Sequence, residues 1–227
     1  MSDWVIDPIA SPSVPVTGGG KFPVRRIFCV GRNYAAHARE MGADPDREPP
    51  FFFTKPADAV ISSHQVPFPS ATRSLHFEME LVVAIGRAGK LVPASHALDH
   101  VYGYAAGVDL TRRDLQDEAK SLRRPWDMSK GFDASAPIGL ISPAATAGHP
   151  SRGQITLSVD GVTKQTGDLA DMIWPVPDII VFLSNLVALM PGDLIFTGTP
   201  DGVGAVERGS RIHGSVEGVG AVSFKLV

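Results

Sequence analysis

The stretch Phe77-Glu-Met-Glu-Leu-Val-Val-Ala-Ile85 decides the fold. Its second half, Leu81 to Ile85, is apolar without interruption, as in a strand that is covered on both faces. Ahead of it, Glu78 and Glu80 stand two positions apart, and alternation along a strand puts both carboxylates on one face. Because a strand disfavours two like charges side by side, the stretch predicts either a compensating divalent cation or a solvated outer face.

Many short strands and few helices surround this stretch. We expect strands at 26–31, 77–86 and 101–110, a hairpin at 154–164 around Asp160-Gly161, and further short strands over 194–227. We expect helices from Asn33 to Gly42, from Thr111 to about Leu122 with Thr111 and Asp114 as a capping box, and from Pro177 to Met190. The pattern predicts a β-rich α+β fold, an irregular mixed β-roll or barrel, and argues against a doubly wound sheet.

The length of 227 residues suits one domain. Residues 1–23 are rich in proline, serine and glycine, so we expect a flexible N-terminal arm followed by a single catalytic domain over 24–227. The net charge of −3 gives no basic surface for nucleic acid. A lone cysteine, Cys29, excludes an internal disulfide. The sequence shows no apolar run of bilayer length and no signal peptide, so we predict a cytoplasmic protein without membrane contact.

A third carboxylate favours the metal interpretation of the glutamate pair. Asp109 ends the apolar stretch Tyr104-Ala-Ala-Gly-Val-Asp and precedes an expected helix, where functional side chains often lie. Its alternative role is an additional cap for that helix. Three carboxylates without cysteine describe a hard-oxygen site, which fits Mg²⁺ or Mn²⁺ better than zinc.

Two further positions are candidates for proton chemistry. His37 and Glu40 are neighbours at i and i+3 on the first expected helix, so the carboxylate can orient the imidazole as a base for water; the alternative is an exposed ion pair. Lys130 lies between small and aromatic residues and is a candidate for stabilising an oxyanion.

Two other segments are candidates for binding an anionic substrate. Arg112, Arg113, Arg123 and Arg124 form a local positive patch, which is otherwise a solvated helix face. The segment Phe196-Thr-Gly-Thr-Pro-Asp-Gly-Val-Gly204 is rich in glycine but lacks the pattern of a phosphate-binding loop. Its backbone N–H groups and the Thr199 hydroxyl can converge on an anion, or the segment is a plain turn.

Taken in order, several segments resemble the fumarylacetoacetate hydrolase family from about Arg26 to Val227. They are Val30-Gly-Arg-Asn-Tyr-Ala-Ala-His, Phe77-Glu-Met-Glu-Leu, Gly107-Val-Asp-Leu-Thr-Arg-Arg-Asp-Leu-Gln, Lys130-Gly-Phe-Asp and Pro191-Gly-Asp-Leu-Ile-Phe-Thr-Gly-Thr-Pro. The likeness is greatest to members that hydrolyse fumarylpyruvate in the gentisate pathway of aromatic degradation. It rests there on Arg39 to Phe53 and on Thr111-Arg-Arg-Asp-Leu-Gln.

The resemblance implies a mixed β-roll, a homodimer, and one Mg²⁺ or Mn²⁺ per subunit held by Glu78, Glu80 and Asp109. It implies a His37–Glu40 pair on a mobile lid and a catalytic lysine at Lys130. The expected substrate-binding residues in the matching segments are Arg32, Arg113, Gln116, Gly198 and Thr199.

The implied reaction is cleavage of a carbon–carbon bond in an acylpyruvate-type diketo acid. The 2-oxo acid end of the substrate chelates the metal, His37 deprotonates water, and the leaving group is a pyruvate enolate that the metal stabilises. The same enolate arises in oxaloacetate decarboxylation and in 2-hydroxydienoate isomerisation, so both stay open as alternatives. A remote alternative is a non-catalytic protein that binds keto acids.

Overall fold

A computed structural model describes residues 4–35 and 49–227 of the chain. The apolar stretch before Gly86 forms strand β8 (Met79–Ile85), and all of its residues are buried. Met79, Leu81, Val83 and Ile85 belong to one apolar cluster, whereas Val82 and Ala84 belong to a second. The strand is therefore covered on both faces, as its uninterrupted apolar sequence predicts.

Strand β8 lies inside a six-stranded mixed sheet with the order β12-β9-β8-β15-β3-β4. The other strands of this sheet are β3 (Arg26–Gly31), β4 (Phe51–Lys55), β9 (Val101–Val108), β12 (Ser142–Pro143) and β15 (Asp193–Phe196). Neighbouring strands are antiparallel except β3 and β15, which are parallel. The strand expected at 26–31 is confirmed at both ends.

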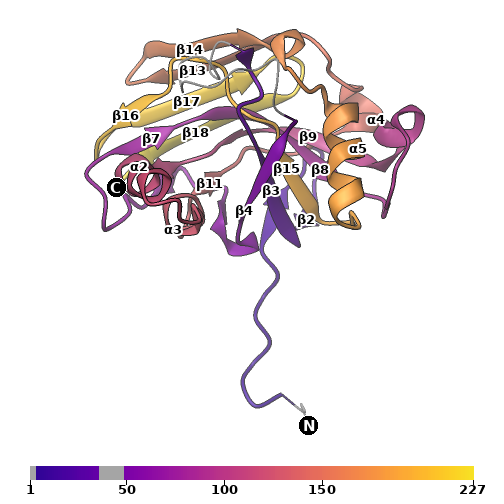
Figure 1. Cartoon of the computed structure of the whole chain (residues 1–227), viewed down its shortest axis with the longest axis horizontal. Helices are drawn as coiled ribbons and strands as arrows, with labels where there is room; N and C mark the ends of the chain where they lie inside the picture. The colour runs from indigo at the N-terminus through magenta and orange to yellow at the C-terminus, as the bar shows by residue number, and fades with distance from the viewer. Residues whose placement is uncertain (1–3, 36–48) are drawn as a thin grey trace.

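A five-stranded sheet packs across the larger apolar cluster, and Figure 1 shows the two sheets as layers. It contains β6 (Gln65–Val66), β13 (Gln154–Val159), β14 (Val162–Asp168), β17 (Arg211–Val216) and β18 (Gly220–Leu226). Strands β13 and β14 form the expected hairpin, and both turn residues have positive φ, 51° at Asp160 and 81° at Gly161. This turn conformation matches the twist of the paired strands.

Three small sheets complete the open roll. They are formed by β7 (Leu75–Phe77) with β10 (Thr111–Arg112) and β16 (Gly204–Val206), by β5 (Val60–Ile61) with β11 (Ala136–Pro137), and by β1 (Ser13–Pro15) with β2 (Lys21–Pro23). Over residues 4–35 and 49–227, no sheet closes into a barrel. The fold is the β-rich α+β roll that the sequence predicts.

The described helices are short. They are α2 (Arg113–Ser121), α3 (Asp127–Lys130), α4 (Ala144–Ala147) and α5 (Val176–Leu186), with 3₁₀ turns η1 (Ala57–Ala59), η2 (Ala94–His100) and η3 (Leu169–Asp171). Helix α5 ends before the expected Met190, because Val187 is extended and Leu189 forms a β-bridge with Gly89. The helix expected from Asn33 to Gly42 falls mostly outside the described residues. No helix among those described is long and apolar enough to cross a membrane.

The capping box expected at Thr111 and Asp114 is wrong. Thr111 and Arg112 pair with β7 as a short strand, so α2 begins at Arg113. The Asp114 carboxylate accepts hydrogen bonds from the Thr72 hydroxyl at 2.6 Å and from the Arg73 backbone N–H at 2.8 Å. Tertiary strand pairing therefore overrides a local helix-start signal.

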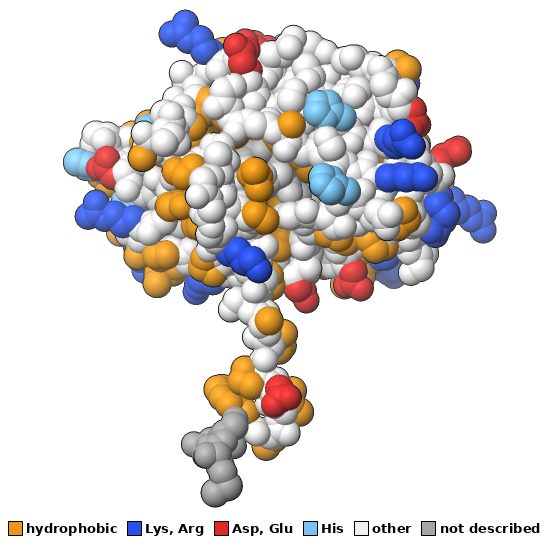
Figure 2. Space-filling view, turned by 180° about the vertical axis from the view of Figure 1, so that it is seen from behind, with side chains coloured by type: hydrophobic (Ala, Val, Ile, Leu, Met, Phe, Trp, Pro, Cys, Tyr) orange, Lys and Arg blue, Asp and Glu red, His pale blue; other side chains and the backbone are white. Residues whose placement is uncertain are grey.

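The N-terminal segment is only partly the loose arm that its composition predicts. Residues 13–23 form the β1–β2 hairpin, whose Val14 and Phe22 are buried in the second apolar cluster. Residues 4–12 extend away from the body, with exposed apolar side chains that include Val5 at 99% exposure (Figures 1 and 2). The hairpin is thus part of the domain, and a flexible arm stays a prediction for the residues before it.

We expect Val14→Ala to lower the free energy of unfolding by about 2 kcal/mol, because it removes two buried methyl groups and leaves a cavity. Val5→Ala is the matched control and should change stability by less than about 0.5 kcal/mol. Urea denaturation of both variants measures the difference. Equal stability of the two variants would mean that the hairpin does not hold to the core in solution.

Candidate active site

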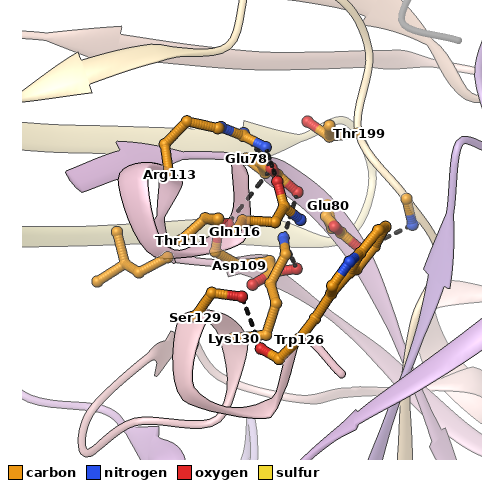
Figure 3. Close-up of polar contacts among 12 residues, drawn as sticks. Glu78, Glu80, Asp109, Thr111, Arg113, Gln116, Trp126, Ser129, Lys130 and Thr199 are labelled. Atoms are coloured by element: carbon orange, nitrogen blue, oxygen red, sulfur yellow. Dashed lines mark hydrogen bonds and ion pairs between the residues drawn. The ribbon is translucent and has the colours of Figure 1, made fainter. Parts of the chain in front are cut away.

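Three buried carboxylates meet where β7 and β9 end and β8 begins. Glu80 lies on β8, Asp109 directly follows β9, and Glu78 joins β7 to β8. The Asp109 backbone N–H donates to the Glu78 carbonyl at 2.8 Å, which holds the two chain segments together. One carboxylate oxygen of each residue lies within 4.8 Å of the others (Figure 3). Oxygen donors at this spacing can hold Mg²⁺ or Mn²⁺.

Strand alternation does not explain why Glu78 and Glu80 are neighbours. Glu78 belongs to no strand, because the chain leaves the sheet of β7 at Phe77 and enters β8 at Met79. Three hydrogen bonds fix the Glu78 carboxylate: Thr111 Oγ1 donates at 3.3 Å, Arg113 Nη2 at 2.5 Å and Lys130 Nζ at 2.8 Å. The predicted convergence is therefore present, but tertiary contacts produce it.

Three cations compensate the carboxylates. Lys130 Nζ lies 2.7 Å from Asp109 Oδ2, Lys55 Nζ lies 2.7 Å from Asp109 Oδ1, and Arg113 pairs with Glu78. Burial lowers the pKa of Lys130, but the charges of Asp109 and Glu78 outweigh it and hold that pKa above its ordinary value. Lys130 is therefore a buried ammonium that contacts two of the three carboxylates.

Glu80 is the carboxylate that gains most from a metal. It is 1% exposed, and no cation pairs with it among the residues that the structure describes. Burial first, and then the charges of Asp109 and Glu78, raise its pKa well above the ordinary value. Its Oε2 accepts the Gly198 backbone N–H at 2.6 Å. Glycine suits position 198, where φ is 95° and a Cβ would lie 2.7 Å from that of Asn33.

The expected substrate-binding residues line one pocket with the two glutamates and Lys130. The pocket has about 400 Å³ of empty space, part of it open to solvent, and its walls include Arg32, Arg113, Gln116, Gly198 and Thr199. Arg113 Nη1 donates to Gln116 Oε1 at 2.5 Å, and Gln165 Nε2 donates to the Thr199 hydroxyl at 2.8 Å. The structure thus brings these residues together around the carboxylates.

The structure does not bring the four arginines of the predicted patch to the carboxylate pocket. Of its four members, only Arg113 reaches the carboxylate pocket. Arg112 lies over the Phe132 ring and donates to the Met128 carbonyl at 3.2 Å, while Arg123 and Arg124 are exposed. Only Arg113 belongs to helix α2. Arg112 ends strand β10, and Arg123 and Arg124 follow the helix, so the four side chains start from different local structures.

His37, the candidate general base, and Glu40, which would orient it, lie outside the described residues, so their roles stay predictions.

Four residues of the site were not predicted from the sequence as site residues: Lys55, Thr111, Lys120 and Trp126. Lys55 is the last residue of the aromatic strand β4, and neither adjacent residue in the sequence is charged. Lys120 could have been predicted from the sequence, because its spacing from Arg113 and Gln116 puts all three side chains on one face of a helix.

The model of the fumarylacetoacetate hydrolase family, described as the C-terminal domain of fumarylacetoacetate hydrolase, matches residues 26–227. Fumarylpyruvate hydrolase of Pseudomonas aeruginosa, crystallised with Mn²⁺ and pyruvate, is 51% identical, with a TM-score of 0.97 and 99% of each chain covered. A Burkholderia cenocepacia protein with a proposed fumarylpyruvate hydrolase activity is 57% identical, with a TM-score of 0.93, 99% of this chain and 98% of that chain covered.

A mitochondrial oxaloacetate tautomerase of Arabidopsis thaliana is also similar. It is 41% identical over 201 residues, which cover 88% of this chain and 90% of that protein. The human mitochondrial oxaloacetate tautomerase is 39% identical over 203 residues, which cover 89% and 91% of the two chains. Proteins with two different reactions thus share this sequence pattern.

Loss of Glu80 should remove divalent metal binding. We expect Glu80→Gln to weaken Mn²⁺ affinity by more than about 100-fold, since even outer residues of a metal site contribute 10- to 100-fold. Glu118→Gln, on the exposed side of α2, is the matched control. Isothermal titration calorimetry measures both, and unchanged affinity in Glu80→Gln would remove this residue from the metal site.

Metal binding should also release a proton. Because the pKa of Glu80 is raised, this carboxyl holds a proton at a pH where an ordinary glutamate does not, and a metal requires the ionised form. Apparent Mn²⁺ affinity should therefore rise with pH and level off above the raised pKa. At mildly acidic pH, titrations in buffers of different ionisation enthalpy should give different heats, and identical heats would contradict this assignment.

Proposed function

Because the chain belongs to the fumarylacetoacetate hydrolase family, we propose that it hydrolyses an acylpyruvate at a divalent metal. The preferred substrate is 3-fumarylpyruvate, which gives fumarate and pyruvate, in the gentisate pathway. The observation that carries the proposal is the convergence of three buried carboxylates with the Lys130 ammonium in one pocket. The 51% identity to an enzyme crystallised with Mn²⁺ and pyruvate, a product of this reaction, supports the choice of substrate.

Glu78, Glu80 and Asp109 would hold Mg²⁺ or Mn²⁺, and the bound ion would supply Lewis-acid stabilisation of the enolate that leaves as pyruvate. The pocket beside the carboxylates has Gln116 and the Thr199 hydroxyl available to orient the 2-oxo acid end. Lys130 donates from Nζ, and its positive charge stabilises an oxygen that gains negative charge during cleavage.

We assign water activation to His37 and orientation of its ring to Glu40. Hydrolysis requires a base that takes a proton from water, whereas decarboxylation does not. The assignment rests on the i,i+3 spacing of the two residues and on the family pattern.

A second candidate function is tautomerisation of oxaloacetate. The similarity to the mitochondrial oxaloacetate tautomerases of Arabidopsis thaliana and Homo sapiens favours it. Keto–enol exchange passes through an enolate of the same kind, so the carboxylates and Lys130 suit it equally. Oxaloacetate decarboxylation and 2-hydroxydienoate isomerisation share that intermediate, and a keto-acid-binding protein would use the same pocket without turnover.

We further propose a homodimer. Trp4, Val5 and Ile6 expose apolar side chains on a segment that extends away from the body, which a second subunit could cover (Figure 2). Light scattering after size-exclusion chromatography measures the mass directly. The cytoplasmic location stays a prediction from the sequence.

The reaction is tested by following the ultraviolet enol band of 3-fumarylpyruvate with Mn²⁺-loaded protein and with protein treated with a chelator. We expect metal-dependent loss of the band with stoichiometric pyruvate. Parallel assays of oxaloacetate tautomerisation and decarboxylation decide between the candidates. Turnover of oxaloacetate without turnover of any acylpyruvate would reject the hydrolase.

His37→Ala should lower kcat for acylpyruvate hydrolysis by about 10²- to 10⁴-fold, the usual contribution of a general base, with Mn²⁺ affinity nearly unchanged. Glu40→Gln should lower it less, because water can still partly orient the ring. Oxaloacetate decarboxylation, if present, should change far less in either variant. If His37→Ala hydrolyses acylpyruvates at the wild-type rate, the base lies elsewhere.

A further inference from the structure

Lys120 lies on the face of α2 that borders the carboxylate pocket. Arg113, Gln116 and Lys120 occupy positions i, i+3 and i+7 of the helix, which share one face, and all three line the pocket. Arg113 and Gln116 are buried and hydrogen-bonded to each other, and Arg113 also forms an ion pair with Glu78 (Figure 3). Lys120 stands one turn farther from the carboxylates, and 30% of its side chain is exposed.

The charge of Lys120 is poorly compensated. Its ion pair with Asp117 is long, at 3.7 Å, and Asp117 is 62% exposed, so this pair is weak. Partial burial first, and then the like charge of Arg113, lower the pKa of Lys120, and Arg32 adds to the same repulsion. A half-buried ammonium beside two guanidinium groups would be stabilised by an anion in the pocket.

The surroundings of Lys120 suit an extended organic anion. Its Nζ lies 5.5 Å from the centroid of the Trp126 ring, and Phe51 forms another wall of the same pocket. Arg113 and Lys120 are seven positions apart, which corresponds to about 10 Å along the helix axis. A ligand with one end at the carboxylates therefore passes flat aromatic walls before it reaches the ammonium.

We propose that Lys120 binds a second carboxylate at the substrate end remote from the metal, so that the site selects 2-oxo acids that are anionic at both ends. The inference rests on the proposed function for placing the 2-oxo acid end at Glu78, Glu80 and Asp109. Lys120 is then a specificity-determining residue that distinguishes acyl groups by the charge at their far end. It replaces the arginine patch that the sequence suggested for this purpose.

The test compares two ligands that differ only at the far end. 2-Oxoadipate ends in a carboxylate, whereas 2-oxohexanoate ends in a methyl group. Calorimetric titration of both into Mn²⁺-loaded protein measures selectivity without turnover. We expect wild type to bind 2-oxoadipate at least about tenfold more tightly, the usual effect of a hydrogen bond to a charged group. Added salt should reduce the preference.

Three variants assign the preference to one residue. Lys120→Met keeps the aliphatic stem on Trp126 and should reduce the preference to about twofold or less, with Mn²⁺ affinity unchanged. Lys120→Arg should retain the preference because it restores the charge. Arg124→Met removes an exposed cation of the same helix–loop region that does not line the carboxylate pocket, and it should behave as wild type.

The outcomes separate this inference from the proposed reaction. If wild type shows no preference, or if Lys120→Met keeps it, the role of Lys120 is wrong. If Arg124→Met loses the preference instead, the far carboxylate binds in the adjoining hollow that Arg124 lines. If the preference depends on Lys120 but no acylpyruvate is hydrolysed, the hydrolase proposal fails and the selectivity for doubly anionic 2-oxo acids stands.

Discussion

The constraint on which the structure depends is the burial of three carboxylates in one place. Charged groups of one sign lose hydration and repel each other when they are buried together, so they need compensation nearby. Lys55, Lys130 and Arg113 supply it for Glu78 and Asp109 from strand β4 and helices α3 and α2, and Glu80 is the carboxylate left for a metal. Segments that are far apart in the sequence are thereby fixed against the ends of β8 and β9. The ion pairs determine the arrangement of the site as much as strand pairing does.

Strand β8 can carry a buried carboxylate because the strand is covered on both faces. Its odd-numbered residues pack against the five-stranded sheet, while Val82 and Ala84 pack under the β1–β2 hairpin and its neighbours. Glu80 shares the face of Val82 and Ala84, so its carboxylate emerges at the buried end of the second cluster. The local dielectric is low there, and electrostatic interactions with a metal or substrate are correspondingly strong.

Sequence patterns predicted those parts that depend on local periodicity or on the chemistry of adjacent residues. The strand at 26–31, the Asp160-Gly161 hairpin and the acidic residues around β8 are of this kind. Lys55 and the Thr111 hydroxyl could not be predicted, because contacts with distant segments give them their positions. The composition of residues 1–23 predicted a flexible arm where the structure has the β1–β2 hairpin. Burial of two side chains, Val14 and Phe22, holds this hairpin on the core although many of its neighbours favour loops.

Helix α2 combines two tasks on one face, separated by about one turn. Arg113 and Gln116 are tied to the carboxylates, so changes at either would disturb the floor of the pocket. Among the described residues, Lys120 has a long ion pair with the exposed Asp117 and a contact with the Trp126 ring, so changes there leave the floor intact. Substitutions at Lys120 can therefore change the substrate during evolution while the carboxylates and their partners stay in place. Proteins that share a common enolate chemistry can diverge in this way, one rim side chain at a time.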